Sequence, residues 1–202
     1  IINNGQGNIT VGDINVNSLK GTASADALSG RSGNDFENDV IDGMGGNDVL
    51  TGYRGADQLN GGVGNDEVRA GNGKDILTGG EGMDELYGGF GMNTFTGEQD
   101  GYADDLYLKS DHLAVNWLTN TANNNPNGYK TDEIGALDSY DKIHIQGAMD
   151  SQLSFMDTSH VRGDGTELDG IGIYASGSLE AVYTGGNLSV QQVMSMTSGV
   201  AA

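Results

Sequence analysis

The residues of this chain whose type and spacing could do chemistry are aspartates placed nine residues apart. Asn93 takes the next place in the same register. The six aspartates of this register are Asp39, Asp48, Asp57, Asp66, Asp75 and Asp84. Ca²⁺ takes about six to eight oxygen ligands, among them carboxylates and backbone carbonyls. An unbroken row of carboxylates therefore predicts a row of cation sites.

Two further aspartates precede this register. Asp26 and Asp35 are also nine residues apart, but their register is offset by four from that of Asp39. Residues 30–42 thus carry four extra residues, and we expect a bulge or a broken coil there. Asp35 and Asp39 cannot both occupy the standard position.

Other residue types follow the same period, and the unit reads G-x-x-G-N-D-x-L-x. Glycine recurs two and five residues before the aspartate, with Ala70 as an exception, and an apolar residue follows two residues after it. Glycine allows a tight turn with positive φ. The apolar residue would be the inward side chain of a short strand, which only stacked turns can bury. Two nine-residue units then make one full coil with a strand on each side. The two inner faces would be lined by Leu50, Val68 and Leu86, and by Ile41, Leu59, Leu77 and Phe95.

Stacked coils would bring like carboxylates together, because neighbouring strands lie about 4.8 Å apart. The expected partners are separated by one full coil, that is, by two units: Asp39 with Asp57, Asp48 with Asp66, Asp57 with Asp75, and Asp66 with Asp84. Backbone carbonyls at the first and third turn positions would complete each cation site. These candidates are Gly43, Gly45, Gly52, Arg54, Gly61, Val63, Gly79 and Glu81. We expect roughly five to seven Ca²⁺ ions in all.

The repeat resembles the G-G-x-G-x-D-x-U-x nonapeptide of RTX proteins, the hemolysin-type calcium-binding repeat family. The resemblance covers residues 21–97, with Asn93 and Ala70 as departures from the pattern. It implies an all-β fold, a right-handed parallel β-roll that folds on binding Ca²⁺. It also implies type I secretion machinery as a partner, with an uncleaved C-terminal signal, and a secreted or cell-surface location.

The flanks predict a capped roll. Residues 1–20 read as one or two short strands, residues 21–97 as the roll, and residues 98–202 as a β-rich C-terminal capping region. Strands are expected at 106–108, 112–118, 142–146, 171–175 and 179–183. Residues 189–196 predict a short helix with Ser189 as N-cap and Val190, Val193 and Met194 on one face. The tail to Ala202 is an export signal or an ordinary C-terminal helix. The chain begins at Ile1 without Met, so we expect a fragment or a processed product.

The composition excludes several classes of partner. With 9 basic and 29 acidic residues, the chain carries a formal charge of −20, which argues against nucleic acid and anionic membranes. There is no cysteine for a disulfide or a thiolate metal site. No apolar run reaches the length of a transmembrane segment, about 18 residues. Such unbalanced charge opposes a compact state unless bound cations are part of the fold.

No enzyme signature stands out in this chain. It has neither an H-E-x-x-H helix motif nor a G-x-S-x-G turn. His144 is expected to face solvent on a strand, and His160 to lie in a loop. The leading interpretation is a non-catalytic calcium-binding module of a secreted, S-layer-like or adhesin-like protein. The alternative is the C-terminal secretion and folding module of an exported protease, lipase, or polysaccharide epimerase or lyase, with its catalytic domain upstream of Ile1. A third interpretation gives residues 98–202 a cell-surface glycan as partner.

Overall fold

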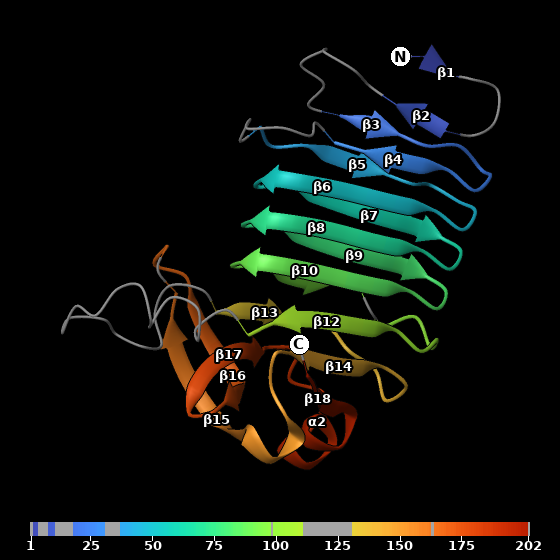
Figure 1. Cartoon of the computed structure of the whole chain (residues 1–202). Coiled ribbons are helices and arrows are strands. Elements are labelled where there is room, and N and C mark those ends of the chain that lie inside the picture. Colours follow the sequence, from blue (N-terminus) through green and yellow to red (C-terminus); the bar gives the residue numbers. More distant parts are fainter. Residues whose placement is uncertain are drawn as a thin grey trace.

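The computed structural model describes residues 2–3, 8–10, 18–30, 37–97, 99–110, 131–162 and 164–201. Two of the sequence predictions, Asp35 and the strand at 112–118, lie outside the described residues. Within them, almost all regular structure is β-strand, and the strands form two sheets that face each other (Figure 1).

The first sheet has the order β1-β2-β4-β6-β8-β10-β12-β14-β18. Its strands are β1 (Ile2–Asn3), β2 (Asn8–Thr10), β4 (Ala27–Ser29), β6 (Val49–Gly55), β8 (Glu67–Gly73), β10 (Glu85–Gly91), β12 (Asp105–Lys109), β14 (Lys142–Gln146) and β18 (Thr197–Val200). All neighbours are parallel except β1 and β2.

The second sheet has the order β15-β16-β17-β13-β11-β9-β7-β5-β3. Its strands are β3 (Leu19–Lys20), β5 (Val40–Asp42), β7 (Gln58–Val63), β9 (Ile76–Glu81), β11 (Thr94–Thr96), β13 (Asp132–Ile134), β15 (Leu153–Val161), β16 (Glu167–Ala175) and β17 (Ser178–Tyr183). The pairing is parallel from β3 to β17 and antiparallel through β17, β16 and β15.

The register of the central strands confirms the predicted coil. Val49 of β6 pairs with Glu67 of β8, and Gln58 of β7 pairs with Ile76 of β9, so that each strand meets the strand two nonapeptides further along the chain. Successive nonapeptides alternate between the two sheets. The chain therefore winds as a parallel roll with one strand of each coil on either side.

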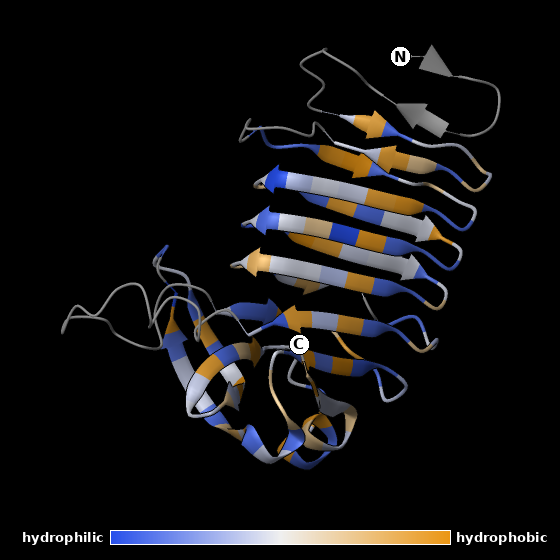
Figure 2. Ribbon diagram, in the orientation of Figure 1, coloured by the Kyte–Doolittle hydropathy of each residue, from blue (hydrophilic) through white to orange (hydrophobic). Residues whose placement is uncertain are grey.

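The interior of the roll is a stack of the predicted apolar side chains. Leu50, Val68 and Leu86 from the first sheet are fully buried, as are Leu77 and Phe95 from the second. Figure 2 shows the alternation of apolar and polar residues along these strands that produces this interior. Burying a side chain of this size contributes about 1.5–3 kcal/mol, so a single coil gains little and stacking is required.

The turns depend on backbone conformations that favour glycine. Gly64, at the fourth turn position, has φ +134°, and a Cβ there would collide with the carbonyl oxygen of Gly46 in the preceding coil. Met44 and Tyr53, at the second position, also have a positive φ of 74°, although they are not glycine. Close stacking of the coils is thus what fixes glycine in the repeat.

Both sheets continue past residue 97, where the sequence pattern ends. Strands β12, β14 and β18 extend the first sheet, and β13 and β17 extend the second. The division into residues 21–97 and 98–202 therefore stays a prediction about domains, because the sheets cross it. Figure 1 shows the hairpins of β15–β17 and the helix α2 (Val190–Met196) at the C-terminal end of the roll.

The expected C-terminal elements have mixed outcomes. A strand covers 142–146 as predicted, strands include 106–108, 171–175 and 179–183, and Ser189 caps α2 with its side chain. Val193 is the buried residue of α2, whereas Met194 is exposed. The prediction of a loop around His160 was wrong, because His160 is a buried residue of β15.

The short 3₁₀ helix η1 (Asp150–Gln152) precedes β15. Neither η1 nor α2, nor any other helix in the part of the chain that the structure describes, is long and apolar enough to cross a bilayer.

Candidate metal centre

The repeat aspartates form two ladders, one along the turns that lead into each sheet. We define the first ladder as Asp26, Asp48, Asp66, Asp84, Asp104 and Asp141, and the second ladder as Asp39, Asp57, Asp75, Asn93 and Asp132. Each member except the last of its ladder donates its backbone N–H to the side-chain Oδ1 of the next.

Among the repeat members of the first ladder the hydrogen bond hardly varies. The N–H groups of Asp26, Asp48 and Asp66 each donate to the next carboxylate at 2.7 Å. The bond from Asp26 bridges 22 residues, four more than the bond from Asp48, because the four extra residues lie between Asp26 and Asp48. Asp26 thus keeps its place in the ladder, and residues 31–36 of the predicted bulge or broken coil lie outside the described residues.

In the second ladder the geometry changes at Asn93. Asp39 donates to Asp57 at 2.8 Å and Asp57 to Asp75 at 2.9 Å, whereas Asp75 donates to the Asn93 amide oxygen at 3.3 Å. Asp39 is thus a member of the second ladder. Asp35, the other candidate for this position, lies outside the described residues. The aspartate pairs that the sequence places one full coil apart are neighbours in both ladders.

Five of the six aspartates in the nine-residue register, and Asp26 before it, each keep one buried oxygen without a hydrogen-bond partner among the described residues. These atoms are the Oδ2 atoms of Asp48, Asp57, Asp66, Asp75 and Asp84, and the Oδ1 atom of Asp26. An ionised oxygen removed from water without a partner is costly. A cation beside these atoms would remove that cost.

Backbone carbonyls at the first turn position lie beside these oxygens. A Cβ added to Gly52 would lie 2.5 Å from Asp57 Oδ2 and 2.7 Å from the carbonyl oxygen of Ala70, so the two oxygens flank one point. Gly61 is flanked in the same way by Asp66 Oδ2 and the Gly79 carbonyl. Carboxylate and carbonyl oxygens side by side are the ligand types that Ca²⁺ prefers.

The other predicted carbonyls of this position also lie beside a ladder carboxylate. The Gly61 carbonyl lies beside Asp48 Oδ2 at Gly43, and the Gly43 carbonyl lies near Asp26 Oδ2 at Gly21, an oxygen that already accepts from Thr22 N–H. The Gly52 carbonyl lies near Asp39 Oδ2 at Gly30. Ala70, treated in the sequence as an exception to the pattern, supplies its carbonyl like a glycine.

The predicted carbonyls of the third position are engaged differently. The Val63 carbonyl accepts from Gly46 N–H at 2.8 Å, and the Glu81 carbonyl accepts from Gly64 N–H at 2.7 Å. Gly45 forms a bridge with Val63, and Arg54 pairs in register with Asn72. The Val63 and Glu81 carbonyls therefore offer a cation only their second lone pair.

The electrostatics of the ladders favour protonation in the absence of cations. Burial, reinforced by the neighbouring carboxylate, raises the pKa of Asp57 and Asp66 to about 6. The same two causes raise the pKa of Asp75 and Asp84 to about 7, although a backbone hydrogen bond opposes them in each case. A bound divalent cation would favour the ionised form and reverse this shift.

Sequence reasoning missed three ladder members: Asp104, Asp132 and Asp141. All three are buried, but they follow their predecessors at intervals of 20, 39 and 37 residues. Non-repeat segments separate them, so no fixed period could identify them. Asp104 and Asp141 directly precede strands, as the repeat aspartates do, and this is a signal that could have found them, whereas Asp132 begins β13, where the sequence predicted no strand.

An acidic groove of about 570 Å³ follows the first ladder on its outer side. It is lined by Asp48, Asp66 and Asp84, by the strand residues Glu67 and Glu85, and by a single basic residue, Lys142. The groove gives cations in solution a negatively charged route to this ladder. Within the described residues no three acidic or histidine side chains surround one point that could hold a metal, so any ion here depends on backbone oxygens as well.

Comparison with known proteins gives one family. The family model described as RTX calcium-binding nonapeptide repeat (4 copies) matches residues 11–36, 37–68 and 69–100. No curated protein and no solved structure matches the chain significantly. The family match coincides with the part of the roll in which the aspartates keep their nine-residue spacing.

Proposed function

We propose that this chain, an RTX calcium-binding repeat protein, is the calcium-binding module of a secreted or cell-surface bacterial protein, and that its roll folds on binding Ca²⁺ outside the cell. The observation that carries the proposal is the set of buried carboxylate oxygens without partners, of which those of Asp48, Asp57 and Asp66 lie beside a backbone carbonyl. In the proposed site an ion between two coils is held by aspartates one full coil apart and by first-position carbonyls.

Folding and location are linked through the free-energy cost of burying the ladder carboxylates close together. Where Ca²⁺ is scarce, as in the cytosol, repulsion between buried carboxylates and the entropy of the glycines favour the unfolded chain. Outside the cell, the free energy of metal binding becomes free energy of folding. An unfolded chain suits type I secretion, which is the export route proposed here.

The proposed role is structural, in an S-layer-like or adhesin-like protein, and it assigns no catalysis to the repeats. The alternative role, as the C-terminal module of an exported enzyme, uses the same calcium chemistry. The sequence of the gene upstream of Ile1 distinguishes them: a catalytic domain there would favour the enzyme, and further surface-protein domains the structural role.

The proposal also includes a glycan partner for residues 98–202. Tyr107 stacks between Tyr87 and His144 at ring-centroid distances of 4.4 and 4.6 Å, so these rings cover one another's faces. Exposed Tyr102 and Tyr140 are better placed for contact with a sugar. Binding of the chain to a polysaccharide array, and its loss in a Tyr102→Ala/Tyr140→Ala variant, would test this partner.

The calcium proposal is tested by circular dichroism during chelation. EDTA should remove the β signal of the repeat strands, and Ca²⁺ should restore it, whereas Mg²⁺ should do so poorly because it requires a stricter octahedral site. A spectrum that is indifferent to EDTA, from protein shown to be metal-free, would contradict the proposal.

A variant of one ladder aspartate tests the site itself. Asp66→Asn removes a charge that the proposal shares between two ions, so the calcium concentration at the folding midpoint should rise at least about tenfold, equivalent to about 1.4 kcal/mol. The matched control is Asp169→Asn on the exposed surface of β16, which should leave the midpoint unchanged. Equal midpoints for the two variants would rule out a ligand role for Asp66.

A further inference from the structure

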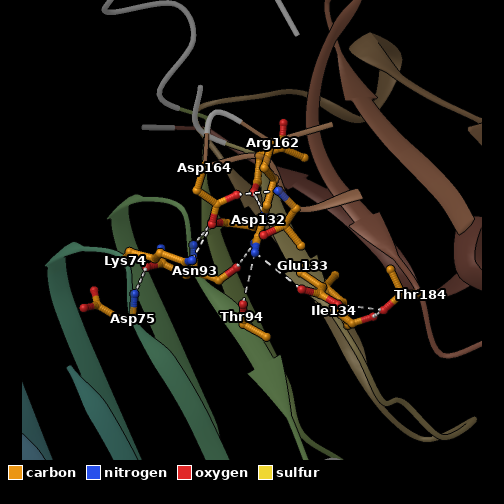
Figure 3. Close-up of polar contacts among 12 residues, drawn as sticks. Lys74, Asp75, Asn93, Thr94, Asp132, Glu133, Ile134, Arg162, Asp164 and Thr184 are labelled. Carbon is orange, nitrogen blue, oxygen red and sulfur yellow. Dashed lines mark hydrogen bonds and ion pairs between the residues drawn. The ribbon is translucent and has the colours of Figure 1, made fainter. Parts of the chain in front are cut away.

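A buried arginine lies at the end of the second ladder. Arg162 directly follows β15, and its side chain is only 2% exposed (Figure 3). The guanidinium donates to the Asn93 carbonyl at 2.7 Å and to the Thr131 carbonyl at 2.9 Å. It also reaches Thr94 Oγ1 at 3.3 Å and Glu133 Oε2 at 3.4 Å. A charge buried to this degree requires such a set of acceptors.

The arginine meets the ladder at the member that lacks a carboxylate. Asn93 Nδ2 is buried, has no hydrogen-bond partner among the described residues, and lies 2.9 Å from a Cβ added to Gly88. Asp57 Oδ2 occupies the equivalent place at Gly52. The second ladder therefore presents an N–H₂ group here instead of an oxygen, and a metal cation gains nothing from such a donor.

The oxygens near Asn93 are used by the arginine instead. The Asn93 and Thr131 carbonyls, oxygens of a chemical type that can also bind Ca²⁺, both accept charge-assisted hydrogen bonds from the guanidinium. Asn93 N–H still donates to Asp132 Oδ1 at 2.6 Å, so the ladder itself continues to β13. The coils therefore still stack at Asn93, but the cation beside the ladder there is the side chain of Arg162.

We propose that the Arg162 guanidinium is the resident cation at the end of the second ladder, where it takes the place of a calcium ion and closes the ladder between Asn93 and Asp132. The inference rests on the proposed function, since it supposes that the regular positions hold Ca²⁺. It assigns opposite properties to neighbouring positions: Asp57 and Asp75 bind metal, and Asn93 does not.

A second contact joins the β15–β16 hairpin to the roll. Lys74 forms an ion pair with Asp164, two residues beyond Arg162. Lys74 occupies the turn position that holds Asn38, Asn47 and Asn65 in other turns, where the side chain accepts a main-chain N–H. The loop between β15 and β16 thus docks on two consecutive turns of the second ladder by charge, and this docking needs no metal.

The test counts calcium ions per chain by equilibrium dialysis at saturating Ca²⁺. The Asn93→Asp/Arg162→Gln double variant restores a carboxylate and removes the cation, so it should bind one more ion than the parent chain. Asn93→Asp alone keeps the guanidinium and should bind the same number as the parent. Arg162→Lys, which conserves the charge, should also match the parent.

The outcomes distinguish the inference about Arg162 from the proposed calcium-binding function. One additional ion in Asn93→Asp alone would overturn the inference even if the double variant failed to fold, because calcium would then enter beside the arginine. An unchanged count in a double variant with parental circular dichroism, beside a calcium-loaded parent, would overturn the inference and leave the proposed function intact. A parent that binds no calcium would instead overturn the proposed function, and this inference with it.

Discussion

The repeat turns and the later turn of Asp141 satisfy their buried aspartates in different ways. In the repeats, Asp57 and Asp66 each use one oxygen to accept from the preceding coil and keep the other without a partner. Beyond the repeats, Asp141 accepts from Asp104 N–H at 3.1 Å with one oxygen and from Asp138 N–H at 2.7 Å with the other. The regular turns thus leave an oxygen available to a cation, whereas this later turn uses main-chain donors.

The repeat half and the C-terminal half also differ in the number of apolar side chains that each strand buries. Each repeat strand buries a single large apolar side chain, as Leu59 and Leu77 do. The antiparallel pair β16–β17 buries several in succession, and Ile173 and Tyr183 join the main core there. The second ladder ends on the buried Arg162 at this same end. The comparison teaches that dependence on calcium should be concentrated in the repeats.

Removal of calcium is expected to have the largest effect, and to act on one half more than on the other. In EDTA the backbone amides of β6–β10 should lose their protection from hydrogen exchange, because the ladders then repel. The amides of β15–β17 should retain at least part of theirs. Hydrogen exchange followed by mass spectrometry, with and without Ca²⁺, measures both. Equal loss in the two halves would break the comparison.

Core substitutions sharpen the comparison. Leu77→Ala in the roll and Ile173→Ala in β16 both empty fully buried sites, so each should lower the free energy of unfolding by about 2–5 kcal/mol in Ca²⁺. In EDTA only Ile173→Ala should still have an effect, since the roll is already unfolded. Urea unfolding under both conditions checks this, and an effect of Leu77→Ala that persists in EDTA would count against it.

The sequence predicts the repeat half far better than the C-terminal half, for a physical reason. A fixed period of nine determines which residues stack, so Leu50 and Asp66 could be placed inside the roll and in a ladder without the structure. No period links Asp104 to Asp141 or Arg162 to Asn93, because their contacts depend on the lengths of intervening loops and on how a hairpin folds back. His160 was assigned to a loop because its polar neighbours concealed a long edge strand.

The local signals in the C-terminal half were reliable where they were strong. The alternation in 142–146 and the cap at Ser189 each identified an element from short-range physics alone. Short-range signals could not indicate which strands pair with one another. The sequence does not reveal that β14 continues the sheet of the repeats.

The pH dependence without calcium should distinguish the ladders from ordinary surface carboxylates. The pKa of Asp57 and Asp66 in the folded chain is raised to about 6, and that of Asp75 and Asp84 to about 7, from an ordinary value of 3.8. The folded state therefore binds more protons than the unfolded state between these limits. Its stability should be greatest near pH 4 and fall as the pH rises through about 6 to 7.

Thermal unfolding in EDTA across this pH range measures the effect. In saturating Ca²⁺ the trend should be reversed, because the metal binds the ionised carboxylates and releases their protons. Metal-free stability that increased between about pH 4 and 7 would show that the ladder carboxylates are not desolvated in the folded chain.

The smallest expected effect comes from the turns. Met44 has a φ of 74°, a conformation that costs a residue with a Cβ about 1–2 kcal/mol. Met44→Gly should therefore stabilise the calcium-bound roll by about 0.5 kcal/mol, once the greater flexibility of glycine in the unfolded chain is subtracted. Met83→Gly is the control, because Met83 is exposed without a positive φ, and it should destabilise. Destabilisation of similar size by both changes would refute the explanation.

The most direct measurement of the central claim is a crystal structure of the chain grown in Ca²⁺, with anomalous diffraction used to locate the ions. The account predicts anomalous peaks beside Oδ2 of Asp48, Asp57 and Asp66, each also in contact with a first-position carbonyl. It predicts no such peak beside Asn93, where the Arg162 guanidinium should lie. Ladders without anomalous peaks, in a roll that is nevertheless folded, would contradict it.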